Sequence, residues 1–248
     1  MKAFINRNLF TQTSLDSGSL TMLGAVIHNF SEPGEYHGTV LRGRDEVGNF
    51  HLTVDKDYPE MQVNIDLAAI DQPDSEHRES ELKKRLVVNP KGYAVFHVSH
   101  GAGGYAVRVS RLDGKSKDEP FDSRELKEGD MFAATLIRPG IYSVVNANNK
   151  VRGEIVVAYS KIKKMPSYRP SDPLSIRCTK KALELDKTEI ERTKKVLEPG
   201  KIEIEPAQGQ VYHFETTSRI RIEFQKPDDG FEHTRPPVID RWRKSMTR

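Results

Sequence analysis

The stretch RPGIYSVVNANNKVRGEIVV, Arg138–Val157, decides the fold class of this 248-residue chain. Pro139 and Gly140 are typical turn residues, and β-branched and aromatic residues alternate with others directly after them. The polar run Asn146–Lys150 separates this alternation from a second one that opens at Gly153. Two alternating runs joined by a polar turn predict a hairpin, here one belonging to a small β-sandwich.

The same alternation continues along most of the chain. Every second residue is apolar in Phe50–Val54 and Met61–Leu67, and again in Lys201–Ile204 and Ile220–Phe224. Pro-Gly, Asp-Gly and Asn-Pro pairs separate these runs as turns. Strands with one polar face, broken by turns at short intervals, predict a mainly β protein built as an antiparallel β-sandwich.

The composition excludes several classes of partner and of metal site. The 39 basic residues are balanced by 36 acidic ones, so no phosphate-tracking surface is indicated and we expect no nucleic-acid partner. Cys178 is the single cysteine, which excludes an internal disulfide and a multi-thiolate zinc or iron–sulfur site. The apolar stretch Leu20–Ile27 is too short to cross a bilayer, so we expect a cytoplasmic protein with no membrane partner.

Two stretches break the strand pattern. Thr179–Leu197 carries a narrow apolar stripe that ends before Pro199 and Gly200, which predicts a helix. Asp71–Arg85 is charged throughout. The chain is therefore expected to divide into N-terminal strands (1–70), a charged linker or short helix (71–88), the sandwich portion (89–160), a Pro/Lys-rich linker (161–175), a helix with a β-hairpin (176–224) and an extended basic arm (225–248).

The arm ends in a cluster that joins an aromatic residue to cations. Arg241, Trp242, Arg243 and Lys244 have the composition of a docking segment for an acidic partner surface. A Trp in such an arm also has the alternative of folding back onto its own domain. We expect the helix and the arm to serve assembly, with protein partners or with further copies of the chain.

The segment Gly92–Tyr159 resembles the C-terminal third of the cupredoxins, the plastocyanin-like β-sandwich family. In that family a strand with Pro-Gly-x-Tyr leads into a metal-binding loop, and the next strand opens with Gly. The positions that carry the resemblance are Phe132, Pro139, Gly140, Tyr142, Gly153, Ile155 and Val157.

The resemblance implies a copper site, but the ligand positions do not hold copper ligands. Where the family has Cys, His and Met, this chain has Asn146, Asn149 and Val151. An amide or an isopropyl group cannot replace the soft sulfur donors of a blue-copper site. We therefore predict a copper-free, cupredoxin-like sandwich without a cofactor.

Histidines provide the alternative, a metal protein or metal-dependent enzyme. His97 and His100 lie beside a Gly-rich turn, and a third ligand would come from His28, His37 or His51. Residues three apart on a strand point to opposite faces, so a pair at this spacing is more typical of a polar strand end than of a ligand set.

Pro33, Gly34 and Tyr36 repeat the Pro-Gly-x-Tyr pattern of the opening stretch. Shared turn chemistry explains this likeness more simply than a duplicated unit, since the flanking segments do not align.

No catalytic motif stands out. Gly101–Gly104 lacks the Lys-Ser or Lys-Thr of a phosphate-binding loop, and Ser99 has no nucleophile-elbow context. The sequence thus favours a non-enzymatic structural or protein-interaction subunit that forms a homo- or hetero-oligomer. A His-ligated metal protein and a carbohydrate-binding module are the alternatives, and the second is weakened because the one Trp lies in the arm.

Overall fold

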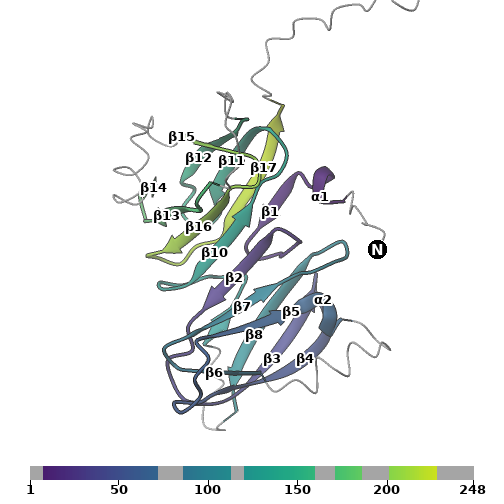
Figure 1. Ribbon diagram of the computed structural model, residues 1–248, viewed down its shortest axis with the longest axis vertical. Helices are drawn as coiled ribbons and strands as arrows, with labels where there is room; N and C mark the ends of the chain where they lie inside the picture. Colours follow the sequence, from purple (N-terminus) through teal and green to yellow (C-terminus); the bar gives the residue numbers. More distant parts are fainter. Residues whose placement is uncertain (1–7, 72–85, 113–119, 160–170, 186–200, 228–248) are drawn as a thin grey trace, which may run out of the picture.

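The computed structural model describes residues 8–71, 86–112, 120–159, 171–185 and 201–227, and this part of the chain is mainly β (Figure 1). Two single-turn helices, α1 (Asn8–Thr11) and α2 (Leu67–Ile70), accompany the strands. The strands are β1 (Ser14–Asp16), β2 (Gly24–His28), β3 (Gly34–Arg42), β4 (Asp45–Val54), β5 (Gln62–Asp66), β6 (Leu86–Val88), β7 (Tyr93–His97), β8 (Tyr105–Arg111), β9 (Phe121–Asp122), β10 (Met131–Thr135), β11 (Gly140–Asn146), β12 (Arg152–Val157), β13 (Leu174–Cys178), β14 (Leu183–Leu185), β15 (Lys201–Ile204), β16 (Gly209–Phe214) and β17 (Ile220–Lys226).

The strands form three sheets. Sheet A has the order β1-β17-β11-β12-β15, sheet B has β6-β4-β3-β8-β9, and sheet C has β14-β13-β16-β10-β2-β7-β5. Sheet B and β2, β5 and β7 make the N-lobe, while sheet A and β10, β13, β14 and β16 make the C-lobe (Figure 1). Sheet C therefore runs through both lobes and joins them at the antiparallel pair β2·β10.

The two lobes repeat one strand pattern. Each lobe contains the same antiparallel and parallel pairs in the same chain order. The corresponding strands are β2 and β10, β3 and β11, β4 and β12, β5 and β13, β6 and β15, β7 and β16, and β8 and β17.

The first strands of the two repeats are exchanged between the lobes. β9 comes directly before β10 in the chain but pairs with β8 of the N-lobe, and β1 comes before β2 but pairs with β17 of the C-lobe. Buried Ser17 follows β1 and buried Ser123 follows β9. Their hydroxyl groups accept the backbone N–H of Ile220 and of Val107, at 3.1 and 2.9 Å. In both lobes, the exchanged strand is thus followed by a serine whose hydroxyl accepts a backbone N–H from the lobe that the strand joins.

This duplication corrects the interpretation of the two Pro-Gly-x-Tyr hairpins. Tyr36 donates its hydroxyl to the carbonyl of Glu32, and Tyr142 donates to that of Arg138, at 2.7 Å in both cases. Shared turn chemistry accounts for that local likeness, but not for the matching pairs of all the surrounding strands. The repeat was hidden because it consists of long-range pairings more than of similar residues.

The hydrophobic cores of the two lobes lie on the same face of sheet C. Val26 of β2 and Phe132 of β10 are directly opposite each other, and both are fully buried. Side chains opposite each other in a sheet share a face, so the two cores share one face of sheet C. In the N-lobe, Phe50 of sheet B reaches Phe96 of sheet C, with their ring centroids 6.1 Å apart.

The mainly β class is confirmed, but the expectation of purely antiparallel sheets is wrong. β4·β6, β5·β7, β12·β15 and β13·β16 are parallel pairs. In the N-lobe, β4, β5, β6 and β7 alternate between sheets B and C, so the chain returns to each sheet in the same direction. Two parallel strands of one sheet are therefore connected through a strand of the other sheet, where a βαβ unit would use a helix.

The predicted helix Thr179–Leu197 does not begin as expected, because Leu183–Leu185 form β14. Pairing of Leu183 with Cys178 and of Leu185 with Ile176 overrides the local helical pattern there. Residues 186–200 lie outside the described part.

The strands predicted from alternation are confirmed in β4, β5, β15 and β17. The predicted segment boundaries cut across the lobes. Residues 89–160 supply β7, β8 and β9 to the N-lobe and β10, β11 and β12 to the C-lobe, and β6 lies in the expected linker 71–88. β13 begins at Leu174, inside the expected linker 161–175. Residues 72–85 and 161–170 of the two expected linkers lie outside the described part.

Candidate functional site

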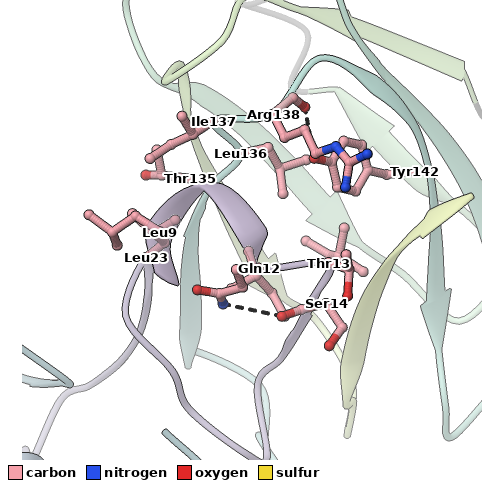
Figure 2. Close-up of a pocket in the computed structure, with 12 residues that line it drawn as sticks. Leu9, Gln12, Thr13, Ser14, Leu23, Thr135, Leu136, Ile137, Arg138 and Tyr142 are labelled. Carbon is pink, nitrogen blue, oxygen red and sulfur yellow. Dashed lines mark hydrogen bonds between the residues drawn. The ribbon is translucent and has the colours of Figure 1, made fainter. Parts of the chain in front are cut away.

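Each lobe has a cavity where its Pro-Gly-x-Tyr strand begins. Figure 2 shows the C-lobe cavity, which holds only about 10 Å³ of space. Leu9 and Gln12 of the N-terminal segment line it together with Leu136 and Tyr142. Gln12 Nε2 also donates to the carbonyl of Ser14 at 3.2 Å. The chain therefore fills this cavity itself, leaving room for roughly one water molecule.

The N-lobe cavity is much larger, with about 280 Å³ of space. In its wall Tyr36 takes the place of Tyr142, Phe30 that of Leu136, and Pro120 that of Ser14. The full lining is His28, Asn29, Phe30, Ser31, Glu32, Tyr36, Arg111, Pro120 and Lys127. The lining combines aromatic residues with charged and polar ones, and small-molecule pockets likewise combine apolar walls with a few polar groups.

His28 in the wall of the N-lobe cavity is paired with the carboxylate of Asp130. His28 Nδ1 lies 2.5 Å from Asp130 Oδ1, and Asp130 Oδ2 accepts the backbone N–H of Lys127 at 2.6 Å. Asp130 is buried, whereas the side chain of His28 is 17% exposed. Because Nδ1 donates to the carboxylate, Nε2 is the ring nitrogen left for a ligand. Phe30 and Phe121 hold the ring on its sides, with centroids 4.4 and 4.6 Å away.

The contact between the start of the Pro-Gly-x-Tyr strand and the last strand of each lobe differs chemically between the lobes. In the N-lobe, Arg111 Nη1 forms an ion pair with Glu32, and Nη2 donates to the carbonyl of Pro33 at 3.2 Å. In the C-lobe, the Arg138 guanidinium lies 4.0 Å from the centroid of Phe224, which replaces Arg111 on the corresponding strand. In the C-lobe a cation–π contact thus links β11 to β17, where in the N-lobe an ion pair links β3 to β8.

A second candidate surface is the face of sheet C that points away from both cores. Its centre, which we call the shared face, consists of apolar residues that are neither buried nor fully exposed. The depression that Ala25, Ala133 and His97 line has about 240 Å³ of open space. The shared face comprises Ala25, Ile27, Val95, Met131, Ala133 and Val211, from the four central strands β2, β7, β10 and β16.

The structure separates the histidines predicted as metal ligands. His97 lies at the end of β7, beside the shared face, while His100 lies in the following turn with Nδ1 2.7 Å from Ser99 Oγ. His37 and His51 face each other across β3·β4, with centroids 5.4 Å apart, and His28 contacts Asp130. Within the described residues no group of three potential metal ligands occurs. A metal on His97 and His100 stays a prediction, testable by metal analysis of untagged protein.

Two of the three residues that stand at the copper-ligand positions of the cupredoxins, Asn146 and Asn149, shape the β11–β12 turn. Asn146 is fully buried, donates to Ser218 Oγ at 2.8 Å and accepts from the backbone N–H of Asn148. Asn149 accepts the N–H of Val151 at 3.0 Å and donates to the carbonyl of Thr179. These side chains therefore support the hairpin and its contacts with neighbouring strands.

The single thiol is packed in the C-lobe core. Burial, aided by the charge of Glu215, raises the pKa of Cys178 to about 12. A thiol with so high a pKa is a poor nucleophile and metal ligand at neutral pH. Burial also raises the pKa of Tyr212, on the neighbouring strand β16.

The cationic docking segment Arg241–Lys244 lies outside the described residues and stays a prediction. In the described part, no helix has the length and apolar character needed to cross a membrane. Comparison of the chain with protein-family models, curated proteins and solved structures gives no match.

Sequence reasoning missed both candidate sites. His28 and Asp130 are 102 positions apart, so only the β2·β10 pairing brings them together. The shared face had a sequence signal, because Gly24–Ile27 and Met131–Ala134 are apolar at nearly every position. Such runs are typical of strands covered on both faces.

Proposed function

We propose that the protein is a non-enzymatic structural or interaction subunit, a copper-free β-sandwich protein that self-associates through the shared face. The observation that carries this proposal is the apolar outer surface of β2 and β10. An outward-facing strand surface normally carries polar residues, since it lies in water. Here Ile27, Met131 and Ala133 occupy those positions at the centre of the largest sheet.

The shared face has the anatomy of an interface. Its apolar centre is bordered on one side by Asn64 and Asp66 of β5 and on the other by Ser175 and Arg177 of β13. An apolar core inside a polar rim is the usual arrangement of protein–protein contacts. On the β13 side Arg177 forms ion pairs with Glu184 and Glu215, and on the β5 side Asp66 accepts the backbone N–H of Ala68, so the charged groups of the rim are compensated within the chain.

The size of the face fits a second copy of the chain. Seven strands at about 4.8 Å spacing and about five residues in length cover roughly 600 Å². Two such faces would bury roughly 1,200 Å² in total, the lower end of the range for specific interfaces. Two sheets packed face to face at about 10 Å would then bury both apolar centres.

Light scattering after size exclusion tests the proposal on the full chain. The wild type should show twice the 28.2 kDa chain mass. Val95→Lys and Val211→Lys change equivalent positions of the two lobes on the shared face, and each should give a monomer. Ser143→Lys is the matched control, because Ser143 lies opposite Glu154 and Glu223 on the outer surface of sheet A.

Circular dichroism establishes that the variants remain folded. A monomeric wild type, or a dimer that survives both lysine substitutions, would overturn self-association through this face.

A further inference from the structure

Comparison of the two lobes distinguishes the residues that the fold requires from those that are specific to the N-lobe. The position of His28 in β2 corresponds to Ala134 in β10, and that of Asp130 to Gly24. The C-lobe completes the same strand pairs with Ala134 and Gly24. The histidine–carboxylate pair is therefore no requirement of the fold.

A pair of this kind has an energetic cost that the C-lobe avoids. Burying a carboxylate is unfavourable unless charge and hydrogen bonds compensate it. Asp130 is 3% exposed and receives His28 Nδ1 and the backbone N–H of Lys127. His28 lines the 280 Å³ cavity. Because an imidazolium donates from both ring nitrogens, a bound anion can accept from Nε2 while Nδ1 stays with Asp130.

The remaining charges at the wall favour a negatively charged ligand. Glu32 is neutralised by its ion pair with Arg111. Lys127 also lines the cavity, and among the described residues no carboxylate forms an ion pair with its ammonium group. His28 and Lys127 therefore offer two donors to one anionic group, while Phe30, Tyr36 and Pro120 form an apolar wall.

We propose that the N-lobe cavity binds a small organic anion, a carboxylate or phosphate ester with a flat apolar part. The anionic group accepts hydrogen bonds from His28 Nε2 and Lys127 Nζ, and the apolar part packs against Phe30, Tyr36 and Pro120. The C-lobe cavity cannot bind the same ligand, because Leu9 and Gln12 leave it about 10 Å³. This proposal is independent of self-association through the shared face.

Isothermal titration calorimetry of the full chain tests the site with benzoate, phenyl phosphate and inorganic phosphate. We expect benzoate or phenyl phosphate to bind at one site per chain. His28→Gln and Lys127→Gln should each weaken binding about tenfold, the loss expected for one charge-assisted hydrogen bond. His51→Gln is the control, since His51 is an exposed histidine on sheet B, and it should bind like the wild type.

Each outcome decides the proposal. The probe that binds, benzoate or phenyl phosphate, identifies the anionic group as a carboxylate or a phosphate ester. Binding of inorganic phosphate alone would overturn the role of the aromatic wall. No binding of any probe to the wild type, or equal binding by the wild type and Lys127→Gln, would overturn the site. Lys127 is exposed, so its variant is expected to fold even if His28→Gln does not.

Discussion

The strand exchange makes a quantitative prediction about two buried serines. Ser17→Ala and Ser123→Ala each remove a hydroxyl that accepts one backbone N–H, from Ile220 and from Val107. Both serines are fully buried, and so are both residues that donate to them. Water therefore cannot replace the lost acceptor, and each substitution should lower the free energy of unfolding by about 1–3 kcal/mol.

Denaturant unfolding of the full chain measures this loss, and for a chain of this size each kcal/mol lowers Tm by about 2–4 °C. The two sites lie in different lobes, so their effects should add in the double variant. Ser143→Ala is the control, because Ser143 lies on the outer surface of sheet A opposite Glu154 and Glu223, and it should change stability by less than about 0.5 kcal/mol. The reasoning is refuted if either serine variant is as stable as the control.

Three further predictions concern single residues. Gly140→Ala should destabilise the protein by at least about 1 kcal/mol more than Gly34→Ala in the same unfolding assay. A Cβ at Gly140 would lie 2.7 Å from the carbonyl oxygen of Lys226, whereas a Cβ at Gly34 would have its nearest neighbouring atom 3.4 Å away. Equal losses of stability would contradict this. Cys178, with its pKa raised to about 12 by burial, should react with a thiol reagent at pH 8 only after denaturation, and stoichiometric labelling of native protein would be the opposing result. Burial and the hydrogen bond to Asp71 raise the pKa of Tyr105 to about 12, so the folded state favours the neutral phenol, and stability should fall as pH rises from about 10 to about 12. Tyr105→Phe should reduce that fall, as measured by urea unfolding across this pH range, and an unchanged slope would speak against the assignment.

The strands were predictable where the signal is local. Phe50–Val54 and Ile220–Phe224 alternate between a buried and a wet face, and they are strands in the structure. The alternation carries no information on direction, so the parallel pairs were missed. At Leu183 and Leu185 the local pattern gave the wrong secondary structure. It favoured a helix, but pairing with β13 makes this segment a strand.

The repeat was only partly visible in the sequence. Beyond the Pro-Gly-x-Tyr pattern, Leu15-Asp16-Ser17 and Phe121-Asp122-Ser123 match, and each is followed by a buried leucine, Leu20 or Leu126. This similarity is short, and its meaning depends on which lobe each strand joins. The exchange of β1 and β9 is a property of the folded chain, so no local pattern could predict it.

The candidate cavity could not be predicted for the same reason. Four separate segments bring His28, Tyr36, Arg111 and Lys127 together, and none of them carries a motif. The signal that exposes the site is the comparison of the two lobes, in which Ala134 and Gly24 replace the histidine and the carboxylate.

Crosslinking at the centre of the shared face tests self-association most directly. Ala133→Cys puts a reactive thiol beside Ala25 on the outer side of β10, while the buried thiol of Cys178 stays unreactive in the native protein. A short bismaleimide should join two Ala133→Cys chains into a covalent dimer and leave the Ser143→Cys control monomeric. If Ala133→Cys is modified but stays monomeric, or if both variants crosslink equally, the shared face does not join two copies.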